Sequence, residues 1–215
     1  MIVRLAALLT VLSSLALASP APAAPAHAAD RAVLAGGCFW GMEAVFESLK
    51  GVTKVVSGFS GGSAATAHYE IVSTGMTGHA ESVEITYDPA QISYAQLLQV
   101  YFTVAHDPTE LNRQGPDGGT QYRSTIFYAN DEQKRVAEQT IHALTAAKTF
   151  HDPIVTTVVP LTAFYAAEAY HQHFAENHPA YPYIVYNDKP KLVALRKQYA
   201  QLLKPHAVAI VLTTP

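Results

Sequence analysis

The chain has 215 residues, of which 49% are hydrophobic and 14% charged, and its formal net charge at neutral pH is −3. These values are typical of one globular domain with a sizeable core, and they exclude a disordered chain. The charge gives no basic surface for nucleic acid, and the single cysteine excludes an intramolecular disulfide framework and a cysteine-rich zinc site.

Residues 1–28 have the three parts of a secretory signal peptide. Arg4 supplies the positive start, residues 5–17 are continuously apolar, and Ala26-His27-Ala28 is a cleavage site, with Ala16-Leu17-Ala18 as a second candidate. The apolar run is shorter than the about 20 residues that a membrane span needs. We expect cleavage and no stable membrane insertion; an uncleaved anchor is the alternative.

This interpretation predicts an exported protein, periplasmic or secreted. The expected domain organisation is a signal peptide over residues 1–28, one folded domain over residues 29–205, and a C-terminal tail over residues 206–215.

Residues 31–35 are apolar enough for a buried strand, and two glycines then lead to Cys38. Apolar residues recur at helical spacing behind it, which predicts a helix over residues 40–49. A cysteine at a helix N-terminus faces free N–H groups and the positive end of the dipole, and both favour the thiolate. A buried structural cysteine is the alternative. The flanking Gly-Gly and Phe-Trp favour a reactive sulfur beside an aromatic pocket.

The pattern of the remaining chain predicts further elements in a regular order. Ser93 and Gln96 form a capping box, and Asp131 is the expected cap of the following helix. The first six elements spell β-α-β-β-α-β, a split βαβ, ferredoxin-like arrangement, so we predict an α+β fold with a mixed sheet and extra C-terminal helices. The predicted ranges are strands 52–59 and 82–87, helix 93–105, strand 122–128, helix 131–149, strand 154–160, and helices 162–175 and 189–203.

A series of short motifs connects residues 32 to 178. They are Gly-Cys-Phe-Trp-Gly at 37–41, Gly-Phe-Ser-Gly-Gly at 58–62, Tyr-Glu at 69–70, Thr-Gly-His-Ala-Glu at 77–81, Tyr-Asp-Pro at 87–89, His-Asp-Pro-Thr at 106–109, Asn-Arg-Gln-Gly at 112–115 and Gly-Thr-Gln-Tyr-Arg-Ser at 119–124. In this order they closely resemble the A-type peptide methionine sulfoxide reductases. The resemblance implies a two-layer α/β sandwich that reduces methionine S-sulfoxide, free or in oxidised proteins.

The resemblance also implies roles for individual residues. Cys38 becomes the nucleophile, and Phe39 and Trp40 become the walls of a cage for the S-methyl group. Glu81 becomes the general acid, which requires a raised pKa; from spacing alone it reads as an exposed carboxylate at a strand end. Tyr69 and Tyr122 match the tyrosines that hydrogen-bond the sulfoxide oxygen.

Asp117 matches a family acid near the thiol, although a turn residue before Gly-Gly is an equal alternative. The chain lacks the resolving cysteine that many family members carry near the C-terminus, so it resembles the single-cysteine branch. We therefore expect a sulfenic acid on Cys38, recycled by an external thiol, either a thioredoxin-like protein or a small thiol. We expect no bound cofactor and a monomer.

Ten histidines raise the question of a metal site. Glu168 and His171 have helical i, i+3 spacing, and His173 and His178 follow, but a di-iron bundle needs two Glu-x-x-His copies. Because the chain has one copy, we expect packed histidines here and no metal. His79 and His106 are expected to support loops.

Two other classes of function compete with the reductase. Gly-Cys-Phe-Trp superficially resembles the nucleophile segment of papain-like proteases, but no glutamine precedes Cys38 between residues 29 and 38 to form an oxyanion hole. The third class is a non-catalytic exported module that binds through a histidine-rich face. Activity on methionine sulfoxide that a thiol-blocking reagent abolishes, without peptide hydrolysis, separates the three.

Overall fold

The computed structural model describes residues 29–205; the predicted signal peptide and the tail from residue 206 lie outside the described residues. Within this part, six strands form one sheet in the order β7-β6-β1-β3-β2-β8. All neighbours are antiparallel except β6 and β7. The strands are β1 (Asp30–Ala35), β2 (Val52–Ser60), β3 (Ala80–Tyr87), β6 (Thr125–Tyr128), β7 (Thr157–Pro160) and β8 (Phe164–Ala166).

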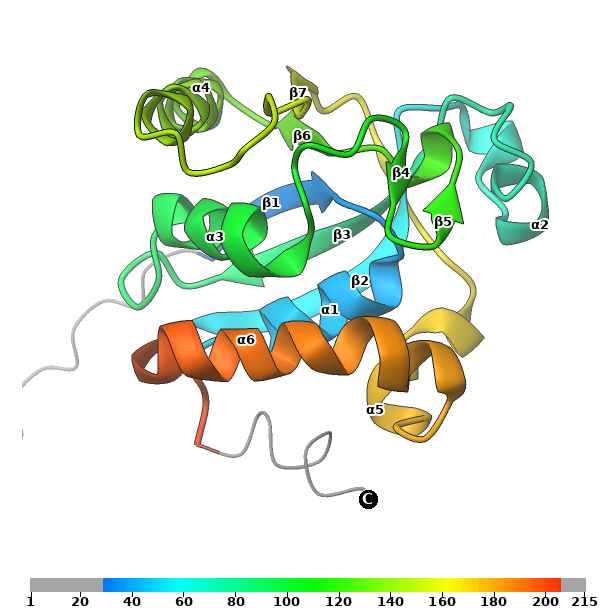
Figure 1. Ribbon diagram of the computed structural model, residues 1–215. Helices are drawn as coiled ribbons and strands as arrows, with labels where there is room; N and C mark the ends of the chain where they lie inside the picture. The colour runs from blue at the N-terminus through cyan, green and yellow to red at the C-terminus, as the bar shows by residue number, and fades with distance from the viewer. Residues whose placement is uncertain (1–28, 206–215) are drawn as a thin grey trace, which may run out of the picture.

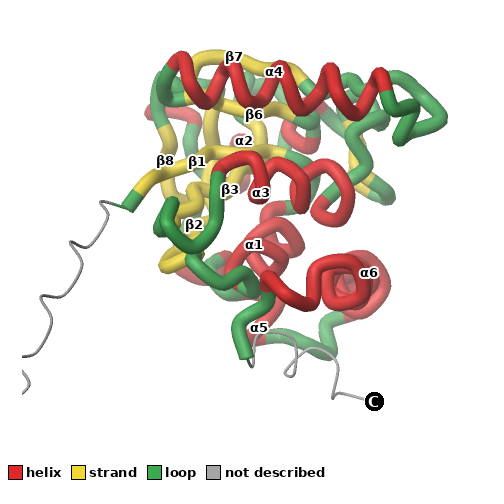
Figure 2. The backbone as a smooth tube through the Cα atoms, turned by 90° about the vertical axis from the view of Figure 1, so that its left-hand side faces the viewer, coloured by secondary structure: helices red, strands yellow, loops and turns green. Residues whose placement is uncertain are grey.

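Helices cover one face of this sheet, as Figures 1 and 2 show, and the main core lies between the two layers. Figure 1 places α6 alongside α1, and α4 beside β6 and β7. The helices are α1 (Phe39–Glu47), α2 (Tyr69–Val72), α3 (Tyr94–Val100), α4 (Asp131–Ala146), α5 (Phe174–Asn177) and α6 (Lys189–Tyr199). A small hairpin pairs β4 (Arg113–Gln114) with β5 (Asp117–Gly118). No helix among residues 29–205 is long and apolar enough to span a membrane.

Strand β1 shows how the two faces of the sheet are filled. Leu34 belongs to the large core under the helices, while Val33 and Ala35 belong to a smaller cluster with Phe127. Successive side chains of a strand point to opposite faces. The short apolar run at residues 31–35 is therefore buried on both sides, as a central strand requires.

Several predicted element bounds are corrected by the structure. The expected strand at residues 122–128 begins only at Thr125, because Thr120–Tyr122 form a 3₁₀ turn. The expected helix over residues 93–105 is α3 followed by a π-helical turn, Tyr101–Ala105. The capping box of Ser93 and Gln96 is present.

The cap of α4 is Asn130 rather than Asp131, since the Asn130 side chain accepts the backbone N–H of Gln133. Asn and Asp are about equally good caps, so local sequence did not separate the two neighbours.

The predicted helix at residues 162–175 is wrong. Residues Phe164–Ala166 form β8, which pairs with the edge of β2, and only a 3₁₀ turn, Ala169–His171, and the short α5 follow. Strand pairing overrides the local pattern here, because β2 otherwise presents unpaired backbone groups at the sheet edge. This edge pairing brings residues 168–174 next to the first turn of α1.

Candidate active site

Cys38 lies at the turn between β1 and α1, immediately before the first helical residue. The turn needs a positive φ of 90° at Gly37, and a Cβ there would collide with the side chain of Gln114. Glycine is the residue that adopts this conformation without strain. The thiol is only 7% exposed, so the turn places the sulfur within the protein rather than on its surface.

The electrostatic surroundings of Cys38 correct one expectation. Burial raises the pKa of the thiol well above its ordinary value, and the charges of Glu81 and Asp188 raise it further. A hydrogen bond from the Trp40 backbone and the charge of Lys191 lower it without reversing the direction. The N-terminus of α1 favours the thiolate, but the loss of hydration on burial has the larger effect on the pKa of the thiol. The unliganded protein therefore holds a thiol at neutral pH.

Glu81 is buried on β3, at 3% exposure, and is not the exposed strand-end carboxylate that spacing alone suggested. Its Oε2 atom accepts the backbone N–H of Phe39 over 3.1 Å. Burial raises the pKa of Glu81 to about 8; the Phe39 hydrogen bond lowers it, and Asp117 raises it. A carboxyl that is protonated at neutral pH is thus held beside the residue that follows Cys38.

Tyr69 on α2 and Tyr122 in the 3₁₀ turn are both partly buried and share the environment of Glu81. Burial raises the pKa of each phenol, and the charge of Glu81 is the second cause in both. Cys38 also acts on both. The structure therefore places Tyr69 and Tyr122 close enough to Cys38 and Glu81 for the charges of these two groups to shift the tyrosine pKa values.

Asp117 lies on the β4–β5 hairpin and acts on the same group of residues, since its charge raises the pKa of Glu81 and of Tyr122. The Tyr183 hydroxyl donates a hydrogen bond to its Oδ2 atom. Burial raises the pKa of Asp117, while this hydrogen bond and Lys191 lower it. Asp117 is therefore not only a turn residue, because its hydrogen bond with Tyr183 connects the hairpin to the segment before α6.

The aromatic residues after Cys38 have different surroundings. Phe39 is buried, with its ring centroid 5.8 Å from that of Phe59 and 6.4 Å from that of Tyr69. Trp40 is partly exposed and stacks one face on Phe174, with centroids 3.8 Å apart. Its Nε1–H donates to Nδ1 of His171 over 3.2 Å. These contacts fix the plane of the indole against Phe174 and His171, two residues after the thiol in the chain.

The histidines that raised a metal hypothesis have other partners. His171 accepts from Trp40, and Glu168 accepts the backbone N–H of Tyr69 over 3.1 Å. Within the described residues, the one group with metal-ligand spacing is Glu43, Glu47 and His173, whose ligand atoms lie within 4.8 Å of one another. Glu43 accepts the backbone N–H of His173, and Glu47 pairs with its Nδ1 atom at 2.8 Å. Hydrogen bonding accounts for this grouping.

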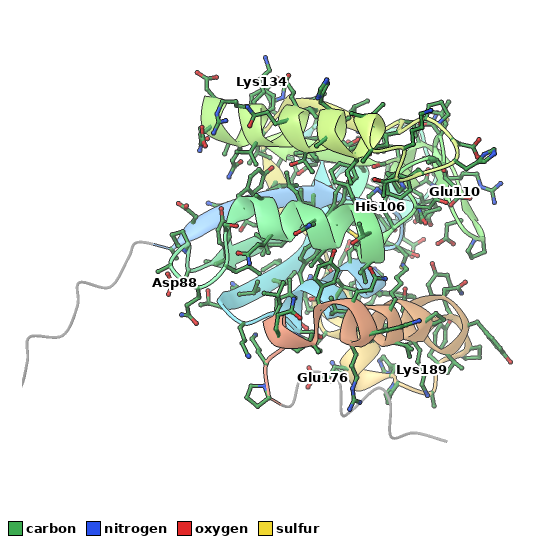
Figure 3. The ribbon with its side chains drawn as sticks, turned by 60° about the vertical axis from the view of Figure 1, so that its left-hand side comes forward. Asp88, His106, Glu110, Lys134, Glu176 and Lys189 are labelled. Atoms are coloured by element: carbon green, nitrogen blue, oxygen red, sulfur yellow. The ribbon has the colours of Figure 1, made fainter. Side chains whose placement is uncertain are left out.

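His106 has a supporting position, at the end of the α3 segment in Figure 3. Its ring bonds the hydroxyl of Ser124 at 2.7 Å and the carbonyl of Tyr101 at 2.9 Å. Burial lowers its pKa to about 4, so the ring is neutral. It packs against Gly36 and so supports the turn that leads to Cys38.

Sequence reasoning missed Tyr183, Asp188 and Lys191, which interact electrostatically with Cys38 from the segment before α6 and from α6 itself. In the sequence, that segment is notable for its lack of a resolving cysteine, and no motif singles out these three residues. Their role depends on how α6 packs on α1.

Comparison with known sequences gives the family context of this site. A family model described as "Peptide methionine sulfoxide reductase" matches residues 30–203. A curated relative from Mesorhizobium japonicum, "Peptide methionine sulfoxide reductase MsrA 2", is 56% identical over 185 residues, which are 86% of this chain and 95% of the relative.

Two solved structures have a similar fold. The reduced form of Mxr1 from Saccharomyces cerevisiae has a TM-score of 0.66 at 30% identity and covers 74% of this chain and 90% of its own. Methionine sulfoxide reductase A of Corynebacterium diphtheriae has a TM-score of 0.61 at 34% identity and covers 73% of this chain and 77% of its own.

Proposed function

This chain belongs to the peptide methionine sulfoxide reductase family, and on that premise we propose that Cys38 attacks the sulfoxide sulfur while Glu81 supplies the proton. The chain is an oxidoreductase enzyme that reduces methionine sulfoxide in the repair of oxidised proteins. The family assignment excludes the cysteine hydrolase and the binding module as the main function.

The position of Glu81 supports this assignment most directly. The carboxyl is bonded to the Phe39 N–H, one residue from the nucleophile, and its pKa of about 8 keeps it protonated at neutral pH. A proton donor must reach the developing charge on the sulfoxide oxygen. Once substrate has displaced water, Glu81 gives its proton to that oxygen and becomes a carboxylate. The proton that Cys38 loses as it attacks then returns to Glu81, so the acid is restored.

The reaction transfers one oxygen atom. The Cys38 sulfur attacks the sulfoxide sulfur and forms an S–S bond. The oxygen then passes to the Cys38 sulfur as the sulfoxide S–O bond and the new S–S bond break, and the products are methionine and a sulfenic acid on Cys38. The methionine sulfur is reduced by two electrons and the Cys38 sulfur is oxidised by two. Phe39 and Trp40 hold the S-methyl group, and Tyr69 and Tyr122 hydrogen-bond the oxygen. The charge of Asp117 helps to keep the pKa of Glu81 raised. The expected substrate is the S epimer.

An external thiol completes the cycle. It condenses with the sulfenic acid to give a mixed disulfide and water, and a second thiol releases Cys38. The chain has one cysteine, which supports an external reductant, either a thioredoxin-like protein or a small thiol.

The catalytic unit is proposed as a monomer over residues 29–205, without a bound cofactor. We assign it to the periplasm or the exterior on the basis of the residue 1–28 sequence. N-terminal sequencing of the exported protein tests the cleavage site. For the sheet, β3 lies between β1 and β2 while β6 pairs with β1, which supports the ferredoxin-like split βαβ class.

The decisive experiment is the intact mass of the purified protein before and after one equivalent of methionine sulfoxide, without reductant. The expected result is a gain of one oxygen atom, located on Cys38, with one methionine released. A chain that releases methionine without a change at Cys38 contradicts the proposal.

A further inference from the structure

An ion pair lies beneath the active site, at the start of α6. Asp188 ends the π-helical turn Ile184–Asp188 and is completely buried, and its Oδ1 atom bonds Nζ of Lys191 at 3.1 Å. The Lys191 side chain is 16% exposed. Within the described part of the chain, Oδ2 of Asp188 has no hydrogen-bond partner. A buried carboxylate in this condition depends on its cation.

The pair packs directly on Gly41, in the first turn of α1. A Cβ on Gly41 would collide with Oδ1 of Asp188 and would lie 2.9 Å from Nζ of Lys191. Residues three apart on a helix share one face, with Cβ atoms about 5–6 Å apart. Gly41 is three residues after Cys38, the N-cap of α1, so the pair packs against the helical turn that directly follows the thiol. Figure 1 shows α6 running beside α1, and Figure 3 labels Lys189 at the start of α6.

The two charges act on Cys38 in opposite directions. The charge of Asp188 raises the pKa of the thiol, and the charge of Lys191 lowers it. Lys191 also faces Asp117 and His106. The other titratable groups that face Cys38 are Glu81 on β3, Tyr69 on α2, Tyr122 in the 3₁₀ turn and Tyr183 before α6.

We propose that Asp188 and Lys191 are positioning residues of the active site, in which Lys191 offsets the negative charge of Asp188 behind Cys38 and thereby sets the charge state of the nucleophile. The inference rests on the proposed function only in taking Cys38 as the nucleophile. It assigns a reason to Gly41, since any side chain there would displace the pair. It also gives the cysteine-free C-terminal segment a part in catalysis.

The test is the pH dependence of Cys38 alkylation by iodoacetamide in the free enzyme, without sulfoxide. Lys191→Met leaves the Asp188 charge unbalanced, so we expect the pKa of the thiol to rise by about one unit and alkylation at neutral pH to slow about tenfold. Asp188→Asn removes the negative charge and keeps an oxygen for Lys191, so alkylation at neutral pH should become faster.

Three further variants complete the design. Lys191→Arg should restore the profile, and Lys197→Met, an exposed lysine of the same helix, should leave it unchanged. Asp188→Asn/Lys191→Met, which buries no unpaired charge, should give a faster rate than Lys191→Met. Thermal unfolding checks that each variant is folded.

Opposite shifts for the two single variants support the proposal, because a purely structural role would move both rates in the same direction. Equal alkylation profiles, or shifts of the same sign, overturn it. Since alkylation needs no sulfoxide, these outcomes are independent of the proposed activity. A failure of that activity would appear instead as an unchanged Cys38 after treatment with methionine sulfoxide.

Discussion

The backbone N–H of Phe39 donates a 3.1 Å hydrogen bond to Oε2 of Glu81 and so ties a buried carboxyl on β3 to the first turn of α1. The two residues are 42 positions apart in the chain. The bond holds the carboxyl beside Cys38 while burial keeps its pKa near 8. In the proposed reaction, this one contact positions the acid for the sulfoxide oxygen next to the nucleophile for its sulfur.

Replacing the thiol tests the nucleophile. Cys38→Ser should lose reduction of methionine S-sulfoxide and keep the fold, because a hydroxyl is a far poorer nucleophile towards sulfur at neutral pH. The side chain is small and buried, so a serine fits the same space. Single-turnover release of methionine is the measurement, with circular dichroism as the control for folding. Appreciable turnover in this variant removes Cys38 from the mechanism.

Removing the proton of Glu81 tests the general acid. Glu81→Gln should slow the reductive step by about 10²–10⁴, the usual scale for general acid catalysis, and should weaken substrate binding less. The wild-type single-turnover rate should lose its acid contribution as pH rises through about 8, where Glu81 ionises, and the variant should lack this step. A single-turnover rate of the variant within a few-fold of the wild-type rate would show that Glu81 is not the general acid.

Truncating the indole tests the pocket. Trp40→Ala should raise KM for methionine sulfoxide by about two- to tenfold, because an aromatic wall contributes area and orientation. Trp40 also packs on Phe174, so Phe174→Leu is the matched variant that loosens this packing while it keeps the indole. Steady-state kinetics with methyl and ethyl sulfoxides are the measurement. The same KM values in Trp40→Ala as in the wild type would mean that Trp40 only packs the helix.

The single cysteine leads to a prediction about the intermediate. Because no second thiol exists in the chain, the sulfenic acid on Cys38 should persist and react with a dimedone-type reagent. Turnover should depend directly on the concentration of external thiol. Mass spectrometry of enzyme with excess substrate and reagent, without reductant, is the measurement. A Cys38–Cys38 dimer as the main product, with no trapped sulfenic acid, indicates resolution between two subunits instead.

Glu43 leads to a prediction about stability. Burial raises its pKa to about 7, and its bond from the His173 N–H lowers it only in part. Between the pKa of the unfolded chain and pH 7, Glu43 is protonated in the folded protein and ionised in the unfolded chain. Its contribution to the free energy of unfolding is therefore fully present below the unfolded pKa and is lost as pH rises through about 7.

Glu43→Gln keeps an acceptor for His173 and should therefore unfold at higher urea concentration than the wild type at pH 8. The gain is at most about 3 to 4 kcal/mol, since the pKa rises from 4.5 to about 7 and one unit of pKa corresponds to about 1.4 kcal/mol. At pH 4 the two proteins should be nearly equal. Glu138→Gln on the exposed side of α4 is the control and should show no such trend. An equal difference at both pH values contradicts the proposed burial of a charge.

The amino-acid sequence by itself determined the local features of this protein. The apolar run at β1 and the helical spacing after Cys38 each depend on neighbours within a few residues, and both predictions are confirmed. The capping box of Ser93 and Gln96 is another local feature that the sequence identified. The family motifs added Glu81 and the two tyrosines, which no periodicity separates from the other acids and phenols.

What only the tertiary structure decided is long-range. Strand β8 forms because β2 offers a free edge, and this pairing outweighs the local preference of residues 162–175 for a helix. Burial raises the pKa of the Cys38 thiol. The position of Cys38 at a helix N-terminus, which the sequence shows, predicts the opposite shift. The charge of Asp188 acts on Cys38 because the start of α6 packs against Gly41, where α1 has no side chain. Sequence determined which reactive groups are present, whereas desolvation and packing between distant segments determined their charge states.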